Sequence, residues 1–107
     1  MPHDAIPAAE VAARILAFLD RIGIPVIRET APDGAVLSDM AVRDGALVVD
    51  LESLRYPGDM LHEAGHIAVT DPALRPTLGE VSSDPAEEMA AIAWSYAAAL
   101  NAGIDPA

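Results

Sequence analysis

The chain has 107 residues, with 17 acidic side chains, six arginines, no lysine and no cysteine, and its formal net charge is −11. That length suits one domain, taken here as residues 1–107, and the 52% of apolar residues is enough for a hydrophobic core. The scattered arginines and the acidic balance exclude nucleic-acid binding through a basic surface and argue against attraction to an anionic membrane. The absence of cysteine excludes disulfides and thiolate metal sites.

The N-terminus and the hydropathy of the chain indicate a cytoplasmic protein. The first residues lack the charged segment and the long apolar segment of a signal peptide. No apolar run reaches the roughly 18–20 residues that cross a bilayer. We therefore expect neither a membrane nor a nucleic acid as a partner, and the sequence does not indicate an oligomeric state.

The first third of the chain predicts a helix, a strand and a turn. Apolar residues recur at helical spacing over residues 4–22, with Asp4 as the candidate N-cap and Gly23 as the left-handed stop. Residues 24–28 are apolar and β-branched, which favours a strand. The Pro-Asp-Gly sequence within residues 30–34 predicts a turn.

A β-hairpin is expected next. The apolar runs at residues 39–43 and 46–51 are separated by Asp44 and Gly45. Asp-Gly is a strong hairpin signal, because both positions of such a turn need a positive φ. Together with the preceding strand, the hairpin predicts a small antiparallel sheet in an α+β domain.

The second half of the chain predicts two helices. The first begins near Asp59, its candidate N-cap, and ends at about Val69. Residues 71–84 form a polar connection expected at the surface. The Asp-Pro-Ala-Glu sequence that begins at Asp84 is a helix start, with a cap, a proline and a glutamate at the expected positions, and this last helix runs to about Asn101.

The most informative segment is an H-E-x-x-H motif inside the first of these two helices. Four residues are about one helical turn, so the imidazoles of His62 and His66 project from one face and can bind one metal ion. Glu63 lies about 100° further round the helix, where its carboxylate can act on a water without binding the metal. Gly65 leaves a bare surface on which a strand or a substrate can approach closely.

Two imidazoles need a third protein ligand to form a catalytic zinc site. The remaining histidine, His3, lies near the terminus, so a carboxylate is expected. Asp71 suits the start of a turn, and Glu80 lies in the connection with little to fix its geometry. Glu87 occupies the capping-box position of the last helix, whereas Glu88 heads an apolar face on which a carboxylate is costly without a positive partner. We therefore favour Glu88 over Glu87.

These segments resemble a known family. The strand Leu-Val-Val-Asp at residues 47–50, the motif Leu-His-Glu-Ala-Gly-His at 61–66 and the sequence Glu-Met-Ala-Ala-Ile-Ala at 88–93 are similar to those of ImmA/IrrE-type metallopeptidases. These are gluzincin-like proteins of the zincin class. The resemblance covers roughly residues 45–101 and implies a minimal zincin-like domain.

The resemblance also implies the roles of individual residues. In such a domain His62, His66 and Glu88 bind Zn²⁺, and Glu63 is the catalytic general base. The implied activity is hydrolysis of a peptide bond in a protein or peptide substrate. In this mechanism zinc activates a water and Glu63 accepts its proton.

One alternative function stays open, namely a catalytically weak or inactive zinc-binding module with a regulatory or interaction role. The acidic surface and the lack of an evident oxyanion donor keep this alternative in view. Arg55, Tyr56 and Tyr96 are the nearest polar side chains, and none has a diagnostic spacing. For Arg55 and Tyr56 a place on the loop surface is the simpler expectation, and for Tyr96 a place in the core.

Overall fold

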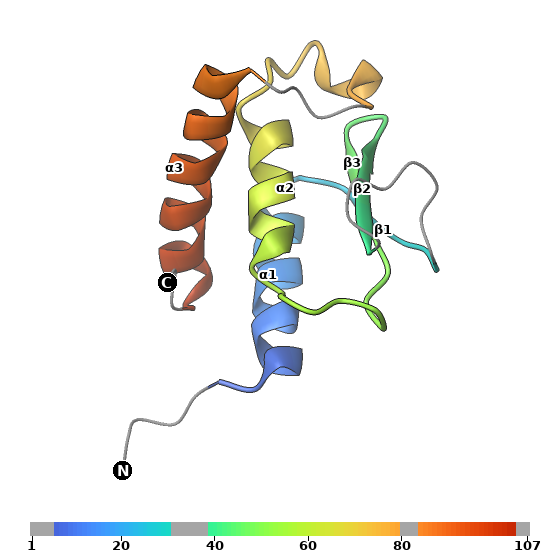
Figure 1. Cartoon of the computed structure of the whole chain (residues 1–107), viewed down its shortest axis with the longest axis vertical. Coiled ribbons are helices and arrows are strands. Elements are labelled where there is room, and N and C mark those ends of the chain that lie inside the picture. The colour runs from blue at the N-terminus through green and yellow to red at the C-terminus, as the bar shows by residue number, and fades with distance from the viewer. Residues whose placement is uncertain (1–5, 31–38, 80–83, 105–107) are drawn as a thin grey trace.

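The computed structural model describes residues 6–30, 39–79 and 84–104. Within these ranges the fold is α+β, with three α-helices and a three-stranded mixed sheet (Figure 1). Asp4, most of the expected turn at residues 30–34, His3 and Glu80 lie outside the described residues. The elements in chain order are α1 (Ala8–Ile22), β1 (Val26–Arg28), β2 (Met40–Arg43), β3 (Ala46–Val49), α2 (Asp59–Ala68), the 3-10 turn η1 (Arg75–Thr77) and α3 (Pro85–Ala102).

Helix α1 packs its apolar stripe into the core and ends where the sequence predicts. It begins at Ala8, later than expected, with Pro7 at the N-cap position. Its buried side chains are Ile15, Phe18 and Leu19, which share one helical face. Gly23 adopts a φ of 83°, and this left-handed residue ends the helix.

The sheet confirms the hairpin and corrects the expected pairing of the first strand. Asp44 and Gly45 have φ values of 52° and 78°, and they connect β2 and β3 in an antiparallel pair. Strand β1, however, pairs with β3 in parallel, so the sheet is mixed and its order is β1-β3-β2. The expectation of an antiparallel sheet was therefore wrong for β1. The most apolar strand, β3, takes the buried centre, and there it needs a hydrogen-bonding partner on each side.

Helix α2 lies between the sheet and α3 (Figure 1), so it is the central element of the core. Its N-cap is Gly58, which makes no side-chain cap, and Asp59 is its first helical residue. The prediction of Asp59 as the cap was therefore wrong. Met60, Leu61, Ala64 and Ile67 are buried and join side chains of α1 and of the sheet in one hydrophobic core.

The connection from α2 to α3 is tied to both the helix and the hairpin. The guanidinium of Arg75 donates to the carbonyl oxygens of Ala68 and Thr70, at 2.9 and 3.1 Å, which satisfies acceptors at the end of α2. The backbone N–H of Gly45 donates to Leu78 at 2.9 Å. A Cβ at Gly45 would collide with the backbone carbonyl of Arg75, so only glycine allows this approach.

Helix α3 begins and ends as the sequence predicts. The carboxylate of Asp84 accepts a hydrogen bond from the backbone N–H of Ala86 at 3.1 Å, and Pro85 is the first helical residue. Gly103, with a φ of 78°, closes the helix in the left-handed conformation. These caps place the two glutamates in the first turn of α3.

Candidate metal centre

Two antiparallel helices carry the candidate ligands (Figure 1). Helix α2 presents His62 and His66 on one face, and α3 runs past it in the opposite direction. The helices approach closely at Gly65, where an ideal Cβ would lie 2.9 Å from the carbonyl oxygen of Ala91. The sequence suggested that a strand or a substrate would use the bare surface at Gly65. In the described structure α3 occupies it, because the missing side chain lets two helix backbones pack closely.

The histidines and Glu88 meet at one point. Nε2 of His62 lies 2.7 Å from Oε1 of Glu88, and Nε2 of His66 lies 3.4 Å from Oε2 of the same carboxylate. One ligand atom from each of the three residues lies within 4.8 Å of the other two. This trio, which the sequence analysis favoured, could therefore hold a metal ion.

The state of His66 fits a cation at this point. Its side chain is 1% exposed, and neither ring nitrogen makes a hydrogen bond with the described residues. The carboxylate oxygens that face the ring lie at 3.4 and 3.5 Å, beyond the usual hydrogen-bond distance. A buried polar group without a partner costs about 1–3 kcal/mol, and a metal ion bound to one nitrogen removes part of that cost. Two imidazoles with one carboxylate are, moreover, a common donor set of catalytic zinc sites.

Glu87 lies on the other side of the His66 ring. Its Oε1 is 3.5 Å from Nδ1 of His66, whereas Glu88 faces Nε2. The two neighbouring glutamates thus face the two different nitrogens of one imidazole. Glu87 is not one of the three candidate ligands, which are His62, His66 and Glu88. This position of Glu87 was not predicted from the sequence, because it depends on how α3 is rotated against α2. At 3.5 Å the two atoms are not hydrogen-bonded, and a shorter approach of the carboxylate would be needed for it to orient the ring and select its tautomer.

Glu63 is half-buried beside the ligands. Burial raises the pKa of its carboxyl above the ordinary value, and the nearby carboxylates of Glu88 and Asp59 raise it further. The imidazoles of His62 and His66 act in the opposite direction without cancelling the effect of burial. A carboxylate with a raised pKa is a stronger base, as a general base for water requires.

Asp59 adds a further carboxylate one helical turn before Glu63. Burial is the first cause that raises its pKa, and the buried Asp39 beside β2 is the second, while His62 lowers it. From the sequence, Asp59 was predicted only as a helix cap. The spacing of the acidic residues at positions 59 and 63 is the sequence signal that their two carboxylates lie close together, since residues four apart share a helical face.

The remaining candidates lie away from the ligands. Asp71 accepts a hydrogen bond from the backbone N–H of Ala73 at 3.0 Å, as its expected place in a turn requires. Arg55 and Tyr56 are exposed, in agreement with the expected loop surface. Tyr96 is 59% exposed, so its expected place in the core was wrong. Tyr96 lies in the wall of a pocket that Leu61 of α2 and Val11 of α1 also line, and it is open to solvent there.

Comparison of the chain with protein-family models, with curated proteins and with solved structures found no match. Among the described helices, none combines the length and the apolarity that a bilayer crossing needs. The geometry of the candidate metal centre and the sequence motif are therefore the observations that bear on function.

Proposed function

We propose that this protein is a zinc-dependent metallopeptidase. The observation that carries the proposal is the meeting of His62, His66 and Glu88 at one point, with a buried imidazole that lacks a hydrogen-bond partner among the described residues. Two nitrogen donors and one oxygen donor suit zinc and leave its fourth position open, which is typical of catalytic rather than structural sites. The resemblance of the motifs to ImmA/IrrE-type metallopeptidases supports the same activity.

The chemistry divides between the metal and Glu63. When bound, zinc supplies a Lewis acid that polarises the scissile carbonyl and makes the attacking water more acidic. The carboxylate of Glu63 accepts the proton of that water and returns it to the nitrogen of the departing amine. In the metal-free protein burial raises the pKa of Glu63, which acts against the lowering that a bound cation would cause.

The proposal is tested by measuring zinc content and peptide cleavage in the same preparations. The wild-type chain should retain about one zinc ion, measured by elemental analysis, and should cleave unstructured peptides, measured by mass spectrometry. Glu63→Gln should keep the zinc and lower turnover by about 10²–10⁴-fold, because an amide cannot accept the proton. Glu52→Gln, the same change at an exposed position outside the site, should alter neither quantity.

Two outcomes would contradict the proposal in different ways. Failure to retain any divalent metal after reconstitution would exclude the metal centre itself. Retention of zinc without cleavage of any peptide or lysate protein would instead favour the zinc-binding regulatory or interaction module.

A further inference from the structure

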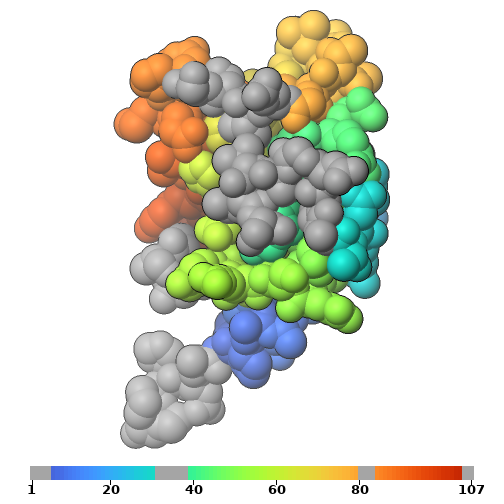
Figure 2. Space-filling model, turned by 45° about the vertical axis from the view of Figure 1, so that its right-hand side comes forward, coloured from blue at the N-terminus to red at the C-terminus, as the bar shows by residue number. Residues whose placement is uncertain are grey.

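The outward side of α3 is apolar or aromatic at every exposed position between residues 89 and 100. Figure 1 shows α3 as the outermost helix, with α2 between it and the sheet, and Figure 2 shows its side chains, in orange and red, at the left-hand edge of the molecular surface. Its large side chains are between 47% and 69% exposed, namely Met89, Ile92, Tyr96 and Leu100. The small exposed residues among them are Ala90, Ala93 and Ala97. These seven residues form what we call the α3 face.

This composition is unusual for a helix side that meets water. No charged side chain occurs in the sequence between Glu88 and Ile104, although the chain has a net charge of −11. The exposed side of α1, by contrast, carries charged side chains, namely Glu10, Arg14, Asp20 and Arg21. A helix that is apolar all round is normally buried, and contiguous exposed apolar surface marks an interaction site. We therefore expect a partner to cover the α3 face.

The charge of the chain limits what that partner can be. A basic protein is attracted to acidic surfaces, but the α3 face has no carboxylate that could pair with a cation. An anionic membrane repels a chain of this net charge. An uncharged helix face of matching length fits best, and a second copy of this chain supplies one. Two copies with a charge of −11 each approach most readily through surfaces without carboxylates.

We propose that two copies of this chain form a dimer in which their α3 faces pack together as antiparallel helices about a two-fold axis. The inference does not depend on the proposed peptidase function. Antiparallel packing places Met89 beside Leu100 of the second copy and keeps Glu87 and Glu88 of the two copies at opposite ends of the contact. Parallel packing would bring these four carboxylates together, and like charges placed side by side are unfavourable.

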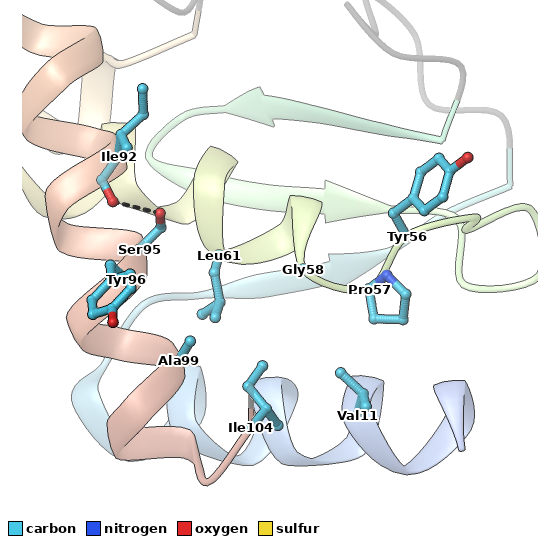
Figure 3. A pocket seen from close by; sticks show the side chains of 10 residues that line it. All are labelled: Val11, Tyr56, Pro57, Gly58, Leu61, Ile92, Ser95, Tyr96, Ala99 and Ile104. Atoms are coloured by element: carbon cyan, nitrogen blue, oxygen red, sulfur yellow. Dashed lines mark hydrogen bonds between the residues drawn. The ribbon is translucent and has the colours of Figure 1, made fainter. Parts of the chain in front are cut away.

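A pocket of about 420 Å³ lies beside the α3 face and gives the surface a recess (Figure 3). Ile92 and Tyr96 belong both to the face and to the wall of the pocket, while Leu61 and Ala99 point into it. Helices pack when projecting side chains of one helix enter the hollows of the other. The same surface thus offers projecting side chains and a recess for a side chain of the second copy, as a self-complementary contact requires.

The contact is small, so the dimer should be weak. Seven residues per copy are about a quarter to a third of the 20–30 that a standard interface uses on each side. From residue 89 to residue 100 the face spans about 16 Å along the helix. We expect a dissociation constant of about 10–500 µM, as for transient rather than permanent complexes.

Sedimentation equilibrium of the full chain measures this association between about 1 µM and about 1 mM. The wild type should change from monomer to dimer as its concentration rises. Ala93→Glu should raise the dissociation constant at least about 10-fold, because two carboxylates then meet across the axis. In the antiparallel pair, residue 93 lies only about 5 Å from its counterpart, measured along the helices. The control is Ala17→Glu, the same substitution at an exposed position of α1, which should leave the dissociation constant unchanged.

The direction of the two helices can be tested with single cysteines, because the chain has none of its own. Met89→Cys and Leu100→Cys, mixed and mildly oxidised, should form a disulfide-linked heterodimer, since a disulfide needs Cα atoms within about 7 Å. Each variant alone should form much less linked dimer. Rapid linkage of Met89→Cys with itself would overturn the antiparallel arrangement.

Four further results would overturn the proposal. The first is a wild-type chain that stays monomeric at about 1 mM. The second is a dimer that Ala93→Glu does not weaken, since it would use another surface. The third is equal weakening by Ala93→Glu and Ala17→Glu, which would reflect repulsion between whole chains. The fourth is a monomer that binds phosphatidylcholine vesicles unless Ala93 is replaced, which would assign the α3 face to a membrane. Both glutamate variants change exposed alanines and should unfold at the wild-type temperature, which circular dichroism checks.

Discussion

The two neighbouring glutamates of α3 face the histidines differently. Glu88 faces both histidines, at 2.7 Å from His62 and 3.4 Å from His66, whereas Glu87 faces only Nδ1 of His66. Because the contact of Glu87 with Nδ1, at 3.5 Å, is too long for a hydrogen bond, Glu87→Ala should weaken zinc binding by at most about 10-fold. Glu88→Ala removes a ligand and should weaken binding further. Competition with a chelator measures both affinities, and equal losses in the two variants would contradict the assignment of Glu88 as the ligand.

The raised pKa of Glu63 predicts how the metal-free fold responds to pH. Because the folded-state pKa is above the ordinary value of 4.5, the folded protein holds a proton that the unfolded chain releases as pH rises through this range. The contribution of Glu63 to stability therefore falls as pH rises from below 4.5 through the raised pKa, and it is constant above that value. In Glu63→Gln the amide does not titrate, so this loss of stability with rising pH does not occur.

Denaturant unfolding of the metal-free protein tests the predicted direction of this pH dependence. Relative to the wild type, Glu63→Gln should be more stable at pH 7, where the buried carboxylate of the wild type is charged. At pH 4 the two proteins should differ little, because the neutral acid and the amide are similar in size and polarity. A larger advantage of the variant at pH 4 than at pH 7 would contradict the direction of the shift.

At the scale of elements, the contact between α2 and α3 depends on Gly65. A Cβ at this position would lie 2.9 Å from the carbonyl oxygen of Ala91, which is backbone and cannot rotate away. Gly65→Ala should cost about 1–3 kcal/mol through overpacking, against a gain in helix propensity of at most about 1 kcal/mol. It should also weaken zinc binding, because α3 carries Glu88 and must move outward.

The matched control for this change is Gly79→Ala, in the connection between the helices. An ideal Cβ at Gly79 meets no atom within 4 Å, so this variant should change the unfolding free energy by less than about 1 kcal/mol. Its zinc affinity should equal that of the wild type. Denaturant unfolding and chelator competition measure the two quantities, and a Gly65→Ala protein that retains full zinc affinity would contradict the role of the close contact.

At the scale of the whole molecule, metal binding should stabilise the fold. A ligand at about 1,000 times its dissociation constant adds about 4 kcal/mol when it binds only the native state, or roughly 15 °C of melting temperature in a domain of this size. Calorimetry with and without zinc measures this shift. His62→Ala should melt at the same temperature in both conditions, and an unchanged wild-type melting temperature would contradict a site formed by the fold.

Several features of the fold follow from neighbouring residues alone and were predicted correctly. The hairpin at Asp44-Gly45 depends on positive φ angles, and the structure has them at 52° and 78°. The start of α3 depends on two adjacent residues. The carboxylate of Asp84 caps a backbone N–H of the first turn, and Pro85 lacks an N–H at a position where the helix does not need one. The parallel pairing of β1 was not predicted, since strand direction within a sheet depends on which segments become neighbours in space.

The candidate site likewise has some features that the local sequence determines and others that depend on tertiary packing. The sequence by itself determined that His62 and His66 share a face of one helix and that Glu63 lies beside them, because a helical repeat of 3.6 residues sets those positions. Only the tertiary structure decided that Glu88 meets both histidines, that Glu87 faces Nδ1 of His66, and that α3 fills the space at Gly65. These facts depend on the rotation and register of α3 against α2. That register is set by close packing between segments about 20 residues apart, and no local pattern encodes it.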